Sequence, residues 1–99
     1  MAKYTVSVDK DLQDIVPGYL EIRRGEVPQL FTQHSSGDFD TLRKSGHKLA
    51  GSGGAYGFDK LTEIGKRLEA LAADGNASGS LACLQELKDY LENLEVTYE

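Results

Sequence analysis

Helical spacing of hydrophobic residues dominates the chain after its first few positions. The clearest example is the series Leu61, Ile64, Leu68 and Leu71, which recurs every three or four residues. This spacing places one apolar stripe along an amphipathic helix. The two-residue alternation that is typical of strands is nearly absent after Val8. We therefore predict an irregular lead-in over residues 1–8 and helices in the rest of the chain.

Local signals indicate where the first helices begin and end. Asp9, or alternatively Ser7, suits the N-cap of a short helix over 9–12, because its side-chain oxygen can accept a bond from a free backbone N–H. Pro17 suits the first turn of a second helix, which is expected to end near 35–37. Pro28 lies within that helix and lacks a backbone donor, so we expect it to kink or split the helix.

The middle of the chain carries two further helices. Asp38 is a candidate N-cap for a helix that carries hydrophobic residues from Phe39 onward. That helix is expected to stop near Gly53–Gly54 or Gly57, because glycine permits the left-handed geometry of a helix exit. Asp59 is expected to cap the next helix.

The last helix completes a predicted bundle. Residues 74–79 are rich in glycine and small polar side chains and predict a loop. A final helix is predicted from about Ser80 to Tyr98. Amphipathic helices joined by short loops favour an all-α fold, namely an up-down four-helix bundle with a short additional N-terminal helix. We expect residues 1–99 to form one domain.

Composition excludes several classes of protein. The only cysteine is Cys83, which cannot form an internal disulfide and fits a reducing compartment. No apolar run is long enough to span a membrane, and the segment 1–6 lacks the apolar stretch of a signal peptide. We therefore expect a cytoplasmic chain with no membrane association. The net charge of −5 argues against nucleic-acid binding, which needs a basic surface.

One basic segment departs from this acidic background. Residues 43–48 carry three fixed positive charges and no acid. On a helix with roughly 100° per residue, Phe39, Leu42 and Leu49 lie on one stripe, and His47 lies about 120° from its centre. His47 is therefore expected to project into solvent near the middle of the helix. Its neighbours on the helical wheel are Arg43, Lys44, Ala50, Gly51 and Gly54.

The glycines of this helix call for an explanation, since each costs up to about 1 kcal/mol relative to alanine. Gly46 and Gly53 fall on the core stripe, where they allow close helix packing. Gly51 points outward one turn after His47, and its bare backbone leaves room for another protein to approach the imidazole. The basic residues beside His47 suit a dianionic phosphoryl group.

Other chemistries fit this segment poorly. The glycine run lacks the Gly-Lys-Ser/Thr ending of a P-loop, and no strand precedes it. His34, His47 and Cys83 are far apart in sequence and do not form a metal-ligand pattern, so no metal site is predicted. Cys83 fits a helix-packing residue better than a nucleophile.

The segment 47–58, together with Leu61 and Leu68-Glu69, resembles the phosphorylation motif of histidine phosphotransfer (HPt) domains. That motif reads roughly His-x-Leu-Lys-Gly-Ser, then small residues and Gly-Phe or Gly-Leu, with Leu-Glu on the next helix. The resemblance implies that His47 accepts a phosphoryl group on Nε2. It also implies that Glu69 holds the other ring nitrogen and so orients the imidazole.

One position departs from the family pattern. The family usually has a lysine three residues after the histidine, where this chain has Ala50. Lys44, Lys48 and Lys66 are the candidates to stabilise the phosphoryl group in its place. Lys66 is the favoured one, because it lies three residues before Glu69 on the same helical face. Arg43, Ala50, Gly51 and Gly54 are the predicted partner-docking residues.

The resemblance implies a phosphorelay carrier of two-component signalling rather than an enzyme with its own kinase activity. It implies exchange of the phosphoryl group with the aspartate of a response-regulator receiver domain, and a receiver or a hybrid sensor histidine kinase as partner. It implies no bound cofactor, because the receiver supplies the Mg²⁺. We expect a monomer. The alternative is a non-catalytic helical module that binds a receiver or kinase without carrying phosphate, which the replacement by Ala50 would favour.

Overall fold

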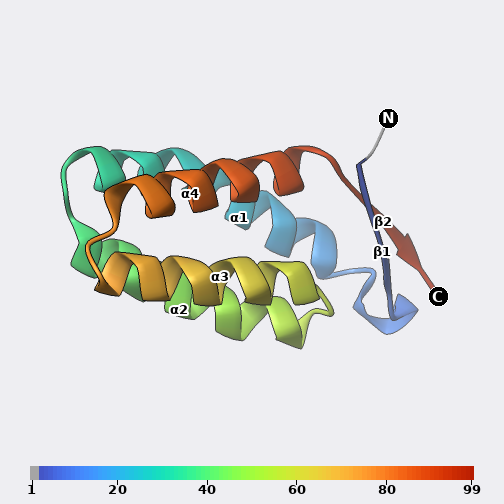
Figure 1. Ribbon diagram of the computed structural model, residues 1–99. Coiled ribbons are helices and arrows are strands. Elements are labelled where there is room, and N and C mark those ends of the chain that lie inside the picture. Colours follow the sequence, from blue (N-terminus) through green and yellow to red (C-terminus); the bar gives the residue numbers. More distant parts are fainter. Residues whose placement is uncertain (1–2) are drawn as a thin grey trace.

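The computed structural model describes residues 3–99 and shows an up-down four-helix bundle with a small sheet at one end (Figure 1). The four helices run in chain order as α1 (Val16–Ser35), α2 (Phe39–Ala55), α3 (Asp59–Ala73) and α4 (Ala77–Glu92). The predicted four-helix bundle is thus confirmed. Within residues 3–99, no helix is both long enough and apolar enough to cross a membrane.

The N-terminal segment differs from the prediction. Tyr4–Val8, which was expected to be irregular, forms strand β1. Lys10–Leu12 forms a single 3-10 turn in place of the predicted short helix. Asp9 caps this turn as expected, because its Oδ1 accepts a bond from the backbone N–H of Asp11 at 2.9 Å. The turn is held in place from the other end of the chain, because the backbone N–H of Lys10 donates a hydrogen bond of 2.9 Å to the carbonyl of Glu99. Leu12 packs partly against the core.

The C-terminal segment differs in a related way. The last helix was expected to reach Tyr98, but α4 ends at Glu92 and Leu94–Tyr98 forms strand β2. β2 pairs with β1 in parallel, in a register that places Val6 opposite Val96. Alternate residues of both strands pack against the core, and the residues between them are exposed. Each strand has only five residues, so its two-residue alternation is too short to stand out in the sequence. The strand with which it pairs lies at the other end of the chain, so no neighbouring segment indicates a sheet.

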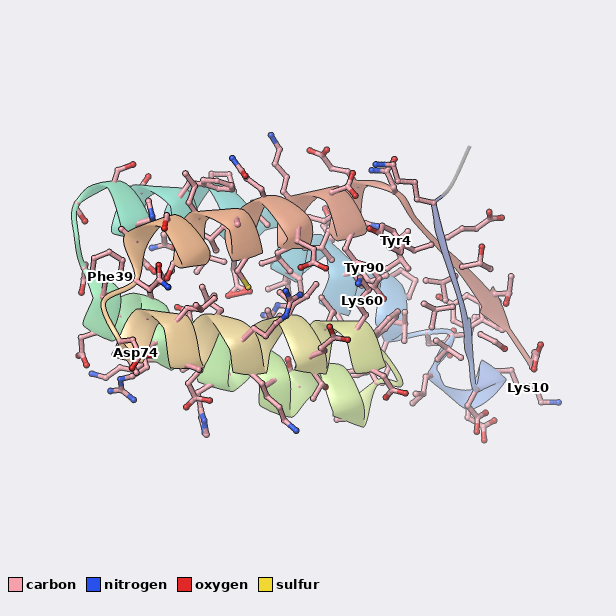
Figure 2. All side chains as sticks on the ribbon, viewed as in Figure 1. Tyr4, Lys10, Phe39, Lys60, Asp74 and Tyr90 are labelled. Atoms are coloured by element: carbon pink, nitrogen blue, oxygen red, sulfur yellow. The ribbon has the colours of Figure 1, made fainter. Side chains whose placement is uncertain are left out.

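Aromatic side chains fix this sheet to the bundle (Figure 2). The rings of Tyr4 and Tyr90 meet edge to face with their centres 5.0 Å apart. Lys60 of α3 lies over the ring of Tyr4, with its Nζ 5.5 Å from the ring centre. The sheet therefore closes the end of the bundle at which α2 ends and α3 begins.

Several helix ends follow the predicted signals. Pro17 lies in the first turn of α1, and α1 is not split at Pro28. Asp38 caps α2, since its Oδ1 accepts a bond from the N–H of Thr41 at 3.2 Å. After the last turn of α2, Gly57 adopts a left-handed conformation with φ of +85°. This conformation is the reason that the chain can reverse within a few residues.

Two helix starts are shifted from their predicted positions. Phe58 rather than Asp59 is the N-cap of α3, because the fully buried Phe58 ring holds the chain at that point. Asp59 then lies in the first turn, where a carboxylate interacts favourably with the helix dipole. Asn76 caps α4 by accepting a bond from the N–H of Gly79 at 2.9 Å. The predicted loop over 74–79 is therefore shorter, and α4 begins at Ala77.

The core lies between the apolar stripes of the four helices. The helical stripe seen in the sequence of α3 is buried at Leu61, Ile64 and Leu68. The largest fully buried side chains of the other helices and of the α2–α3 loop complete this core: Val16, Leu42, Phe58, Leu84, Leu87, Tyr90 and Leu91. Burial of this stripe fixes the rotation of each helix, and so decides which residues of α2 face solvent.

Candidate functional site

His47 lies on the outer face of α2, and its side chain is 74% exposed. The prediction that it projects into solvent near the middle of a helix is thus confirmed. Its Nδ1 lies 3.0 Å from Oε2 of Glu69 on α3. An ionised carboxylate only accepts hydrogen bonds, so Nδ1 carries the proton and donates a hydrogen bond to Glu69. In the neutral ring this leaves the lone pair on Nε2, which points away from Glu69.

The approach of Glu69 to His47 depends on two glycines that face each other across α2 and α3. A Cβ on Gly46 would lie 2.7 Å from the backbone N of Glu69, and one on Gly65 would lie 2.5 Å from the backbone N of Ala50. Neither position has space for a side chain. The two helices therefore pack backbone to backbone, and Glu69, one turn after Gly65, comes within reach of the imidazole.

Positive side chains surround the imidazole on one side. A shallow hollow of about 300 Å³ is lined by Arg43, Lys44, His47, Lys48 and Glu69. Helical side chains lean toward the N-terminus of their helix, so the His47 ring lies over the turn that carries Arg43 and Lys44. Lys66 is exposed on α3 and does not line this hollow. The structure thus brings Lys44 and Lys48, but not Lys66, to the hollow at His47.

Two of these cations are already paired. Asp40, one turn before them on α2, has its Oδ1 at 3.0 Å from Nη2 of Arg43 and its Oδ2 at 3.2 Å from Nζ of Lys44. The hydrogen bond from Arg43, together with Lys44, holds the pKa of the Asp40 carboxyl below its usual value. Lys48 forms no ion pair within residues 3–99.

The positions one and two helical turns after His47 carry only small residues. Gly51 is exposed, and a Cβ at this position would have no atom within 4 Å. Gly54 is exposed as well, but a Cβ there would lie 3.3 Å from Oγ1 of Thr62. Ala50 is half-buried beside α3, where Thr62 donates a hydrogen bond of 3.0 Å to its carbonyl. Among the predicted docking residues, Gly51 and Gly54 therefore offer open backbone, whereas Ala50 belongs partly to the helix interface.

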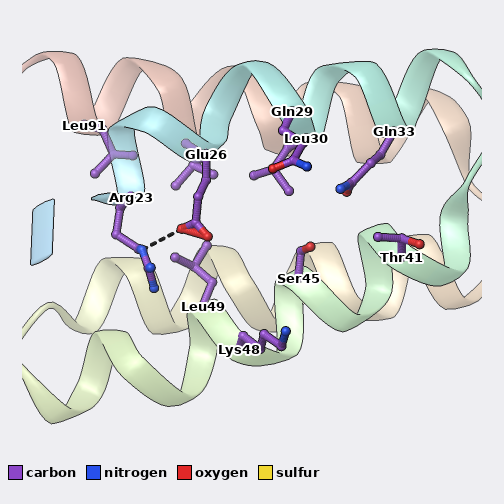
Figure 3. A pocket seen from close by; sticks show the side chains of 11 residues that line it. Arg23, Glu26, Gln29, Leu30, Gln33, Thr41, Ser45, Lys48, Leu49 and Leu91 are labelled. Atoms are coloured by element: carbon purple, nitrogen blue, oxygen red, sulfur yellow. Dashed lines mark ion pairs between the residues drawn. The ribbon is translucent and has the colours of Figure 1, made fainter. Parts of the chain in front are cut away.

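A second depression runs beside the hollow, between α1 and α2 (Figure 3). It has a volume of about 460 Å³ and mixes polar with apolar side chains. Within it, Nε of Arg23 pairs with Oε1 of Glu26 at 2.7 Å. Lys48 lines both this groove and the hollow at His47. The outer surface of α2 is thus continuous from the imidazole to the groove beside α1.

The other histidine has a different environment. Nε2 of His34 donates a hydrogen bond of 2.7 Å to the carbonyl of Ala77, which ties the end of α1 to the start of α4. Its ring also meets Phe39 edge to face. Among residues 3–99, no three His, Cys, Asp or Glu side chains lie together as a possible metal-ligand set. Cys83 is buried on α4, and burial raises the pKa of its thiol.

Two residues of this site were not singled out from the sequence. Gly65 carried a signal, since it is a glycine inside an otherwise strong amphipathic helix. Asp40 carried one too, because its spacing of three and four residues from Arg43 and Lys44 is that of helical ion pairs. Both residues lie outside the segment 47–58 that carries the family motif.

The chemistry available at this site follows from the geometry. An exposed imidazole with a fixed tautomer presents Nε2 as a nucleophile. A neighbouring carboxylate stabilises the positive charge that develops on the ring, and adjacent cations suit an anionic group on Nε2.

The chain matches the family model of the Hpt domain over residues 3–97. No curated protein and no solved structure matches the chain significantly.

Proposed function

Since the chain belongs to the Hpt domain family, the histidine phosphotransfer domains of two-component signalling, we propose that His47 carries a phosphoryl group that it exchanges with a receiver aspartate. Members of this family act as phosphocarriers and interact with receiver domains and kinases. The observation that carries the proposal is the 3.0 Å contact between Nδ1 of His47 and Glu69, on an imidazole that is otherwise open to solvent.

The proposed transfer begins with the neutral imidazole. The Nε2 lone pair attacks the phosphorus of the receiver's aspartyl phosphate, a P–N bond forms, and the P–O bond to the aspartate breaks. The aspartate leaves as a carboxylate, and the ring becomes an imidazolium that carries the phosphoryl dianion and keeps its proton on Nδ1. Glu69 accepts a hydrogen bond from that proton, so its negative charge stabilises the product ring. The reverse transfer follows the same path.

The surrounding residues take supporting roles in this proposal. Lys44 and Lys48 line the hollow at His47 and would offset part of the phosphoryl charge. Gly51 leaves the approach to Nε2 unobstructed on the side of the next turn. The receiver would bring the Mg²⁺ and the acidic residues that bind it. The role of Lys66, the expected monomeric state and the cytoplasmic location stay predictions from the sequence.

Transfer from a phosphorylated receiver tests the proposal. The wild-type chain is incubated with a receiver domain that has been radiolabelled with a small phosphodonor, and label on the chain is followed on a gel. We expect label that is labile in acid and stable in base. His47→Gln should abolish this label without changing the fold, because exposed positions tolerate substitution within about 0.5 kcal/mol.

His34→Gln is the matched control, since it removes the other histidine. It should retain the label, although loss of its bond to Ala77 lowers stability somewhat. Undiminished labelling of His47→Gln would place the phosphoryl group elsewhere. A chain that binds the receiver but never takes up label would support the alternative of a non-catalytic interaction module.

A further inference from the structure

The charge around His47 is distributed unevenly along α2. Residues three and four positions apart are neighbours on a helix. The neighbours one turn before His47 are Arg43 and Lys44, and the neighbours one turn after it are Ala50 and Gly51. The fixed positive charges of Arg43 and Lys44 therefore lie on the N-terminal side of the imidazole. Lys48, the residue after His47, lines the same hollow. This is also the side toward which the His47 ring leans.

Asp40 forms ion pairs with both of these N-terminal cations at once. Its two carboxylate oxygens bind different partners, Oδ1 the guanidinium of Arg43 and Oδ2 the ammonium of Lys44. All three side chains are substantially exposed. Ion pairs of this kind are weak in water and rearrange readily when a stronger anion is nearby. A phosphoryl group on His47 is such an anion, because it carries up to two negative charges at the same hollow.

We propose that Asp40 is a positioning residue that competes with the phosphoryl group for Arg43 and Lys44, and so weakens the hold of this site on its phosphoryl group. The inference rests on the proposed function of His47. With Asp40 present, the phosphorylated state is stabilised less than the number of nearby cations suggests, which favours onward transfer. Removal of the Asp40 charge releases both cations to the phosphoryl group.

The test compares Asp40→Asn with wild type in two measurements. One is the equilibrium distribution of label between the chain and a receiver domain, and the other is the hydrolysis rate of the phosphorylated chain. We expect the equilibrium to shift toward the chain by about two- to fivefold, the effect of one exposed ion pair, and hydrolysis to slow. Asp40→Glu keeps the charge and should restore the wild-type values.

A charge-matched control separates this role from a change in net charge. Glu63 is an exposed acid on α3 that pairs with Arg67 at 3.8 Å and does not line the hollow at His47. Glu63→Gln therefore removes one negative charge of the chain away from the site. It should leave both measurements unchanged. Thermal unfolding of each variant checks that the bundle is intact.

A double-mutant comparison identifies the route of the effect. In a chain that carries Arg43→Gln and Lys44→Gln, Asp40 has no cations to withhold, so adding Asp40→Asn should change neither measurement. Two results would overturn the role of Asp40 and leave the proposed function intact. One is an equal shift in that background. The other is a wild type that takes up label together with an Asp40→Asn variant that changes neither measurement. A wild type that takes up no label would overturn the proposed function and this inference with it.

Discussion

The contact between Gly65 and α2 predicts that Gly65→Ala disturbs both the stability and the site. A Cβ at this position would lie 2.5 Å from the backbone N of Ala50 and 2.7 Å from the carbonyl O of Gly46. Ordinary contacts of a Cβ begin at 3.4 Å. Because both atoms belong to the α2 backbone, no flexible side chain can move away, and the two helices must separate by about 0.7–0.9 Å.

Two opposing terms set the size of the effect. Overpacking of a well-packed interface costs about 1–3 kcal/mol, and alanine is preferred over glycine in a helix by up to about 1 kcal/mol. We expect a net loss of about 1–2 kcal/mol in the free energy of unfolding. For a domain of this size that is a fall of roughly 5–15 °C in Tm. The same separation would lengthen the 3.0 Å contact between His47 and Glu69 beyond hydrogen-bonding distance unless Glu69 rearranges.

Thermal unfolding followed by circular dichroism measures the first effect, and ring ¹⁵N chemical shifts of His47 report whether Nδ1 keeps its proton. Gly51→Ala is the matched control, because it replaces a helical glycine that has no atom within 4 Å of its Cβ position. That variant should gain up to about 1 kcal/mol. If Gly65→Ala were as stable as Gly51→Ala, close contact of the α2 and α3 backbones would not be what positions Glu69.

Two further predictions concern the approach of the partner and the behaviour in alkali. Gly51→Gln should slow transfer from a receiver while Tm holds or rises, because a side chain would occupy the open space one turn after His47; an unchanged rate would show that the partner docks from another side. Burial raises the pKa of Tyr90 from 10.0 to about 12, so the stability contributed by its neutral form is complete below pH 10 and is lost as the pH rises through about 12. Within residues 3–99 its hydroxyl has no hydrogen-bond partner, so Tyr90→Phe should be neutral or stabilising near pH 7 and should unfold less readily above pH 10. Absorbance at 295 nm and alkaline unfolding curves measure both effects. If Tyr90→Phe removed an ionisation near pH 10 rather than one near pH 12, the result would contradict this reasoning.

The helical part of the fold followed from the sequence because it depends on local patterns. The stripe through Leu61, Ile64 and Leu68, the cap at Asp38 and the proline in the first turn of α1 are each signals within one segment. The strands at the two ends of the chain do not depend on local patterns. Tyr4–Val8 is stabilised by Leu94–Tyr98, and a pairing across the whole chain leaves no local signal beyond a brief alternation.

The candidate site divides in the same way. The exposure of His47 follows from its angle to the core stripe of its own helix, and the sequence was sufficient for it. The cation positions depend on side-chain direction as well as on wheel angle. Lys66 shares a face with Glu69 but does not line the hollow, whereas Lys44 and Lys48 come from the helix of His47 itself. The contact between Gly46 and Gly65, which sets the helix spacing, involves two helices and was not predicted as a pair.

The central claim is tested most directly by locating the phosphoryl group on the intact chain. The ¹⁵N-labelled protein is phosphorylated by a receiver domain and studied by ¹⁵N and ³¹P NMR at neutral pH. The account predicts one P–N bond, on Nε2 of His47, with the proton retained on Nδ1 and the His34 ring unchanged. A phosphoryl group on Nδ1 of His47, on His34, or on no histidine at all would contradict it.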